Sequence, residues 1–140
     1  KCQDQAANAG LKGTWRAWVS VARSSVNSRF TRTSGNYIKL DGSVIAHGWA
    51  DLTDGQLDAN GINITEQGKT VVAQTSVWTS TSVTGETVAY TDGTSNCSAF
   101  TSIDNGAISL IGFSATGTSA WTSAYPDICA KSFPLYCFEQ

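Results

Sequence analysis

The chain has 140 residues, of which 41% are hydrophobic, 10% aromatic and only 14% charged, and its net charge is −2. This length suits one domain, and the low charge with abundant aromatic side chains excludes a disordered chain. No apolar run approaches the length of a membrane span, so we expect a single domain over residues 1–140 that does not insert into a membrane.

The N-terminal segment predicts a helix and then a strand. Residues 3–9 predict a short helix, because Gly10 suits the position just after a helix C-terminus. Residues 14–21 predict the clearest strand of the chain, with Trp15 and Trp18 on opposite faces. Both faces of this strand are therefore expected to be partly covered.

A second helix and a hairpin are predicted next. Residues 24–33 predict a short helix, because two of their apolar side chains fall at helical spacing. Residues 37–40 and 43–46 predict the two strands of a hairpin. Asp41 and Gly42 lie between them, and this pair tolerates the positive φ angles of a tight type I′ turn.

The rest of the chain predicts loops and short strands. Residues 48–68 are rich in Asp, Gly and Asn and predict a long loop. Further strands are predicted over residues 71–79, 85–91, 103–112 and 135–138. The whole pattern predicts an α+β fold with an antiparallel sheet, two short helices and long loops. Loops of this length are normally functional or need covalent restraint.

Four cysteines, Cys2, Cys97, Cys129 and Cys137, supply that restraint. None lies in a CxxC motif and the chain has one histidine, so they do not fit a zinc site. An even number of cysteines in a chain rich in Ser, Thr and Gly predicts two disulfides, each worth about 2–4 kcal/mol. We therefore expect a secreted or cell-surface protein. Several pairings are possible, and the spacing does not choose among them.

The basic residues are concentrated near the N-terminus. Residues 1–32 hold six of the nine basic groups and only one acid, whereas the remaining residues hold three bases and ten acids. This asymmetry indicates either a surface that faces a polyanion or charges that scatter around the fold and solvate it. For a sulfated glycan the candidate ligand-binding residues are Arg23, Arg29 and Arg32, because a guanidinium pairs bidentately with anionic oxygens.

Catalytic groups are scarce in this sequence. His47 is the only histidine, so a Ser-His-Asp triad would have to be built on it, and no GxSxG motif is present. We expect His47 to be a structural or surface residue and the protein not to be an enzyme.

Acidic residues suggest one candidate metal site. Asp51, Asp54 and Asp58 lie close together in the Gly-rich loop, and calcium takes about six to eight oxygen ligands, often from such loops. Their spacing does not match an EF-hand, so the alternatives are a calcium site and a hydrogen-bonded loop. Asp92 and Asn96 form a second, weaker cluster of oxygens.

Two aromatic residues before Cys129 are candidates for binding. Trp121 and Tyr125 lie in a predicted loop, where aromatic side chains stack on sugars or anchor a protein partner. The alternative is that both side chains cap the core beneath the loop.

The most distinctive block of the sequence is residues 2–18, CQDQAANAGLKGTWRAW. This block resembles endostatin, the C-terminal domain of some collagens, and is more similar still to bacterial endostatin-like surface proteins. The other blocks that agree in order are residues 48–52, 76–78, the region of Cys97 and residues 135–140.

The resemblance implies a C-type-lectin-like fold with a mixed, mostly antiparallel sheet and with both termini close together. It also implies a nested pairing of the cysteines, Cys2–Cys137 and Cys97–Cys129. By the same resemblance Trp15, Trp49 and Trp78 are assigned to the core.

The departures from the family limit what is carried over. The histidines that bind zinc near the endostatin N-terminus are missing here, so no zinc site is expected. Only Arg16, Arg23, Arg29 and Arg32 could replace the arginine-rich heparin surface of endostatin. The calcium-binding motifs of sugar-binding C-type lectins are also missing, and the nearest match is the weak one at residues 125–127.

From these observations we expect an extracellular binding module on a cell surface that adheres to an extracellular protein of the host matrix or plasma, or to a glycan. The first alternative is a structural subunit that self-assembles into an extracellular filament or coat. The second is a calcium-dependent lectin. We expect no nucleic-acid partner and no cofactor apart from the candidate calcium.

Overall fold

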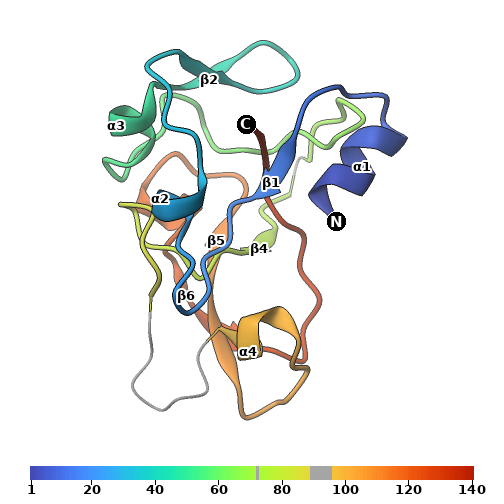
Figure 1. The fold of residues 1–140 in the computed structure, drawn as a ribbon, viewed down its shortest axis with the longest axis vertical. Coiled ribbons are helices and arrows are strands. Elements are labelled where there is room, and N and C mark those ends of the chain that lie inside the picture. The colour runs from blue at the N-terminus through green and yellow to red at the C-terminus, as the bar shows by residue number, and fades with distance from the viewer. Residues whose placement is uncertain (72, 89–95) are drawn as a thin grey trace.

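A computed structural model describes residues 1–71, 73–88 and 96–140, and Figure 1 shows the arrangement of its elements. Along the chain these are α1 (Cys2–Asn8), β1 (Trp15–Ala17), α2 (Val26–Arg29), β2 (Asn36–Ile38), β3 (Val44–His47), α3 (Trp49–Leu52), β4 (Ser76–Trp78), α4 (Cys97–Phe100), β5 (Ile108–Phe113), η1 (Ser119–Trp121), β6 (Tyr125–Ile128) and β7 (Cys137–Glu139). Across these described ranges, no helix has both the length and the apolar character needed to cross a membrane.

The strands form three small antiparallel sheets. β1 pairs with β7, β2 pairs with β3, and β4, β5 and β6 form the largest sheet with β5 in the middle. The predicted α+β class with antiparallel pairing is confirmed. The described strands contain no parallel pair, so the expected mixed sheet is not seen in this part of the chain.

The two ends of the chain are joined by backbone pairing and by a disulfide. Arg16 of β1 lies opposite Phe138 of β7, and the Cys2–Cys137 bond ties α1 to the same strand. Figure 1 shows the C-terminus beside β1, close to α1. The second disulfide joins Cys97 and Cys129, so the nested pairing that the endostatin resemblance implies is the pairing of the structure.

The predicted strand over residues 14–21 is shorter than expected. After Ala17 the chain changes hydrogen-bond partners, because the Trp18 amide donates to the Tyr136 carbonyl and the Ser20 amide to the Thr79 carbonyl. Consecutive residues from Trp18 to Ser20 are buried. The alternation of buried and exposed side chains, typical of a strand covered on one face, therefore ends where the segment enters the core.

Both predicted helices are present and end as local chemistry requires. Gly10 has φ +74°, and the amides of Gly10 and Leu11 donate to the carbonyls of Ala7 and Ala6, which closes α1. The Ser25 hydroxyl accepts a hydrogen bond from the Ser28 amide and caps α2. The sequence did not predict α3, α4 or the 3₁₀ turn η1, so the expectation of two helices was too low.

The hairpin of β2 and β3 is confirmed, but its turn type is not. Only Gly42 has a positive φ, +85°, whereas a type I′ turn needs a positive φ at Asp41 too. The amide of Gly42 donates to the Lys39 carbonyl, and the Lys39 amide donates to the Ser43 carbonyl. The connection is therefore a three-residue loop with glycine in the left-handed position.

The remaining predicted segments are corrected by the structure. The predicted loop over residues 48–68 contains α3, and the strand predicted over 71–79 is confined to β4. The strand predicted over 103–112 begins only at Ile108. Of the strand predicted over 85–91, the described part forms one isolated bridge between Thr81 and Thr87, and residues 89–91 lie outside the described residues.

Trp18 is the centre of the main core. Its fully buried ring lies 4.9 Å from the Trp121 ring, 5.4 Å from the Phe138 ring and 5.6 Å from the Phe30 ring. Its indole nitrogen donates to the Thr122 hydroxyl at 2.7 Å, so burial leaves this donor satisfied. Trp15, by contrast, is only half-buried, because its indole nitrogen donates to the exposed Lys12 carbonyl, and its assignment to the core was wrong.

A second apolar cluster lies around the inner disulfide. It contains Trp78, Ile111 and the Cys97–Cys129 bond, with Phe100 and Phe133 packed against it. This cluster supports the groove that is the candidate site.

Candidate functional site

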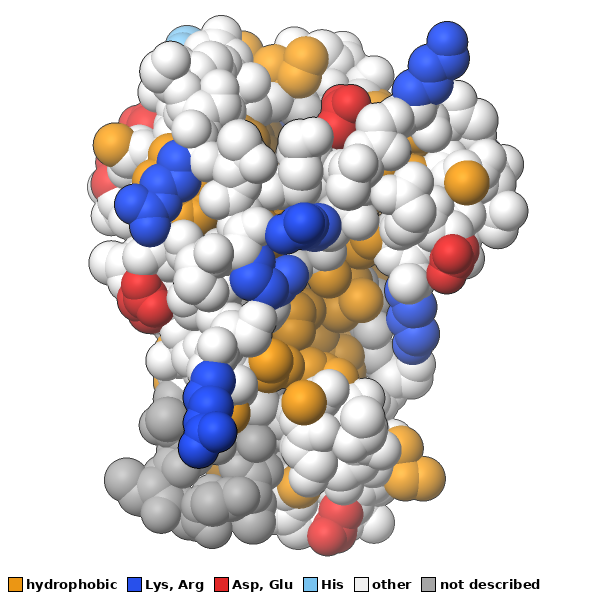
Figure 2. Space-filling model, viewed as in Figure 1, with side chains coloured by type: hydrophobic (Ala, Val, Ile, Leu, Met, Phe, Trp, Pro, Cys, Tyr) orange, Lys and Arg blue, Asp and Glu red, His pale blue; other side chains and the backbone are white. Residues whose placement is uncertain are grey.

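One face of the molecule carries an apolar groove. Figure 2 shows it as a hollow of hydrophobic side chains in the middle of the viewed face. Its volume is about 650 Å³, and Trp78, Phe100, Ile103, Phe133 and Leu135 contribute to its wall. Surfaces of this kind, open to solvent and apolar, mark binding sites more often than scattered apolar residues do.

Trp78 forms the fixed base of the groove. It ends β4, and its amide donates to the Pro134 carbonyl at 3.1 Å, which holds the segment before β7 against the sheet. Its ring lies 5.0 Å from the Phe133 ring and 5.8 Å from the Phe100 ring. The aromatic side of the groove is therefore assembled from three separate segments of the chain.

The turn that carries Phe100 has an unusual backbone. Every residue from Asn96 to Phe100 has a positive φ, between 49° and 64°, so α4 is a left-handed turn. Such a conformation costs non-glycine residues about 1–2 kcal/mol each. The disulfide at Cys97 and the buried Asn96 side chain, which accepts from the Ser80 hydroxyl, hold the turn in place. Backbone strain of this kind concentrates at functional sites.

Basic groups lie along the edge of the groove. Arg29 at the end of α2 donates through Nη2 to the carbonyls of Ala17 and Val19, so its guanidinium braces β1. Arg16 donates through Nη1 to the Arg29 carbonyl at 2.6 Å. Burial, and then the neighbouring charge of Arg16, lower the pKa of Arg29. The Arg16 guanidinium therefore lies at the backbone of Arg29, and the Arg29 side chain lines the groove.

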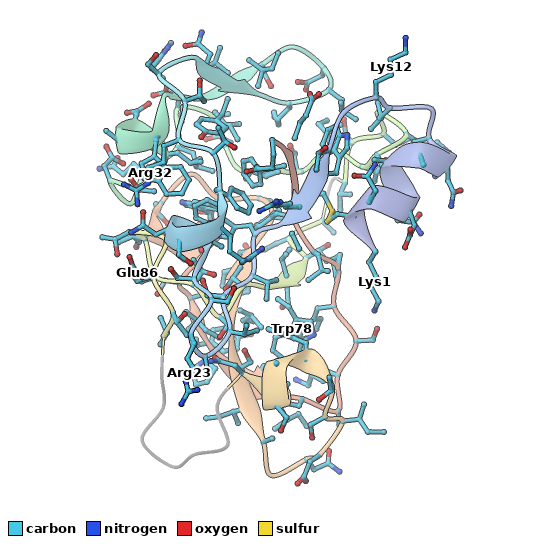
Figure 3. All side chains as sticks on the ribbon, viewed as in Figure 1. Lys1, Lys12, Arg23, Arg32, Trp78 and Glu86 are labelled. Atoms are coloured by element: carbon cyan, nitrogen blue, oxygen red, sulfur yellow. A yellow bond between two sulfur atoms is a disulfide. The ribbon has the colours of Figure 1, made fainter. Side chains whose placement is uncertain are left out.

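The arginines of this face have no acidic partner in the described part of the chain. Its ion pairs involve Lys1, Lys39, His47 and Lys131, and none includes an arginine. Figure 3 places Lys1, Lys12, Arg23 and Arg32 around the viewed face, and Figure 2 shows blue side chains around the hollow. Basic side chains of residues 1–32 are therefore spread over the viewed face, with acidic side chains between them.

The three arginines singled out from the sequence share this face but not one pocket. Arg29 lines the groove. Arg32 lies over the Trp49 ring, 5.8 Å from its centre, and donates to the Asn27 carbonyl at 3.1 Å. Arg23 is exposed in a tight turn with φ 67°. The sequence did not single out the apolar wall beside them, because it depends on a left-handed turn that has no signature in the sequence.

Trp121 is not a surface residue. Its side chain is 0% exposed, and its ring packs on Trp18 and Tyr136, so it is removed from the candidate binding residues. Tyr125 is 47% exposed on β6, with its ring 5.5 Å from the Phe113 ring. It is not among the described residues that line the groove.

Two of the three candidate calcium ligands, Asp51 and Asp58, contact His47, and Asp54 has a separate partner. Asp51 accepts from the His47 amide, Asp54 accepts from the Gln56 amide, and Asp58 lies 3.5 Å from Nε2 of His47. Among the described residues no group of three or more His, Cys, Asp or Glu side chains has the geometry of a metal site. Each of the three carboxylates takes part in a contact within the protein, as a hydrogen-bonded loop would have.

The second oxygen cluster is only partly described. Asp92 lies outside the described residues. Asn96 is buried, and its side-chain oxygen accepts from the Ser80 hydroxyl. Its oxygen is therefore engaged in holding the left-handed turn.

Comparisons with known proteins give no family for this chain. No protein-family model matches it, and no curated protein matches it. Conclusions on function therefore depend on the groove and on the basic groups around it.

Proposed function

We propose that the protein is an extracellular binding module that holds an acidic ligand against the basic face. The observation that carries this proposal is a set of arginines that form no ion pair with the described acidic residues, beside an open apolar groove on the same face. Clustered charge of one sign attracts a ligand of the opposite sign and speeds its association. The two disulfides support an oxidising, extracellular compartment.

Membership of the endostatin-like branch of the C-type-lectin fold is part of the same proposal. The nested disulfides and the pairing of β1 with β7 support it. It points to an extracellular protein or a glycan as the ligand. A fold alone does not fix function, so the basic face rather than the fold carries the argument.

Charge reversal on this face tests the proposal. Arg23→Glu combined with Arg32→Glu should weaken binding to dextran sulfate by about tenfold or more at low salt, because both side chains are exposed cations on the proposed surface. Arg29 is left unchanged, since it also braces β1. Binding is measured by surface plasmon resonance over a series of salt concentrations.

Two controls accompany this measurement. The Arg23→Lys and Arg32→Lys pair keeps the charge, and Lys69→Glu reverses an exposed charge in the loop between α3 and β4, outside the basic N-terminal segment. Both should bind nearly as the wild type does. Equal binding by the double Glu variant and the wild type would contradict the proposal.

A structural subunit is the second candidate, and one observation favours it. Ile38 and Leu40 on the β2–β3 hairpin are 62% and 46% exposed, which leaves an apolar edge free to contact another copy. Light scattering over a concentration series distinguishes the two candidates, because a subunit grows in mass and a binding module does not. No observation favours the calcium-dependent lectin.

A further inference from the structure

The groove has a lining of one charge sign. Its described lining residues include Lys1, Arg29 and Lys131 but no Asp or Glu. Lys131 is neutralised by Asp127, at 2.8 Å. Arg29, by contrast, has the Arg16 guanidinium on its own backbone carbonyl, and the like charge of Arg16 acts on its side chain. An anionic group bound at this edge would relieve the repulsion between the two guanidinium groups.

The same groove leaves apolar surface open to water. Ile103 is 83% exposed, and Phe100, Phe133 and Leu135 are half-buried. The left-handed turn positions Phe100 between the Trp78 cluster and this surface at a cost in backbone strain. Aromatic pockets edged by arginine are typical of the few residues that dominate binding to a protein partner.

The shape of the groove favours an extended chain as its occupant. Pockets for small molecules enclose most of the ligand, whereas this hollow opens along the viewed face in Figure 2. A glycan has no large apolar side chain to cover Ile103 and Phe100. A second copy offers the β2–β3 hairpin, but Lys39 and Asp41 at its tip cancel in charge, so it lacks the complementarity that an acidic segment has.

We propose that the groove binds an extended acidic peptide segment with one aromatic or large aliphatic anchor. The anchor packs between Phe100, Ile103 and Leu135, and flanking carboxylates pair with Arg16 and Arg29. This inference rests on the proposed function and names the ligand of the same face.

Synthetic peptides test the role of the anchor directly. The probe is a fluorescein-labelled, amidated Glu-Glu-Trp-Glu-Glu peptide, and its matched control has Ala in place of Trp. Binding to the full chain is followed by fluorescence anisotropy. We expect the Trp peptide to bind at least about tenfold more tightly, because only it fills the apolar part of the groove. Equal affinity for the two peptides would overturn the inference.

Filling the groove tests the place of binding. Ala130 is an exposed lining residue, so Ala130→Trp should lower the affinity for the Trp peptide by about tenfold. Ala7→Trp adds the same bulk at an exposed position of α1 outside the lining and should change nothing. Because Ile103 is highly exposed and its replacement does not threaten folding, Ile103→Ser is the second variant and should weaken binding of the Trp peptide alone. Unchanged binding in both groove variants would overturn the inference.

The outcomes separate this inference from the proposed function. If dextran sulfate binds with the expected sensitivity to Arg23 and Arg32 but the peptides show no preference for Trp, the inference fails and the proposed function stands. If neither dextran sulfate nor the peptides bind, both fail. If the chain self-associates and Ala130→Trp abolishes this, the occupant is a second copy and the inference is wrong.

Discussion

Buried tyrosines make the stability of this domain sensitive to alkaline pH. Tyr136 is buried beside the Trp121 ring, and its hydroxyl has no hydrogen-bond partner among the described residues. Burial raises the pKa of Tyr136 well above its ordinary value, because the phenolate would lose its hydration. The folded state therefore holds this proton more tightly than the unfolded chain does.

Replacement of Tyr136 by Phe tests this at the scale of one residue. The stabilising effect of the raised pKa is fully present below pH about 10, the ordinary tyrosine value, and is lost as the pH rises above it. Tyr136→Phe should raise the free energy of unfolding near neutral pH by up to about 1 kcal/mol, because it removes an unpaired buried hydroxyl. The variant should also lose less stability than the wild type above pH 10.

Urea denaturation from pH 7 to 11 measures both effects, with Tyr125→Phe as the exposed control. Tyr37, whose pKa is raised mainly by burial, remains in the variant, so part of the alkaline loss persists. If the unfolding free energy of Tyr136→Phe falls with pH as steeply as that of the wild type, ionisation of Tyr136 does not cause the alkaline loss of stability.

At the scale of elements, the left-handed turn is the feature that local propensity does not favour. Ala99 has φ 59° and an exposed side chain. Ala99→Gly should therefore stabilise the protein by about 1 kcal/mol, since glycine adopts this backbone without the steric cost. Ala50→Gly, in the exposed part of α3 with ordinary helical backbone, should destabilise it by about 0.5–1 kcal/mol.

Thermal denaturation of the two variants gives the comparison. The opposite signs are the decisive result, because both substitutions remove one exposed methyl group. Destabilisation by Ala99→Gly of the size seen for Ala50→Gly would contradict a left-handed turn at Asn96–Phe100.

The elements that were predicted well are those with a local chemical cause. Gly10 closes α1, and the glycine after Asp41 forms the hairpin turn, so both were recognised from neighbouring residues. β5 was placed too early because its pairing depends on distant partners. Gly112 lies inside it, where a Cβ would stand 1.9 Å from the Trp121 carbonyl oxygen, and no local pattern shows this close approach.

Of the candidate site, the sequence predicted the basic residues but not the apolar wall. The excess of basic residues over residues 1–32 was visible in the sequence, and Figure 3 shows four of them, Lys1, Lys12, Arg23 and Arg32, on one face. The apolar wall was not visible, because Trp78, Phe100 and Phe133 come together through the Cys97–Cys129 bond and a strained turn. Of the two alternatives for Trp121, the structure shows the buried one, because a short 3₁₀ turn packs its ring against Trp18.

At the scale of the whole molecule, each of the two apolar clusters is associated with one disulfide and with a different part of the fold. The cluster around Trp18 and the Cys2–Cys137 bond hold the termini together, and the cluster around Trp78 and the Cys97–Cys129 bond supports the groove. The inner disulfide therefore lies at the site, whereas the outer one lies with the closing strands. A substitution in the groove can therefore change binding without loosening the cluster around Trp18, so the groove can be tested by mutation.

Chemical-shift mapping tests the central claim most directly. The measurement is the titration of the 15N-labelled protein with the acidic Trp peptide, followed by heteronuclear NMR. The account predicts the largest shifts at Arg16, Arg29, Phe100, Ile103 and Ala130, around the groove. Shifts that are largest at the β2–β3 hairpin or in α3, with none at these positions, would contradict it.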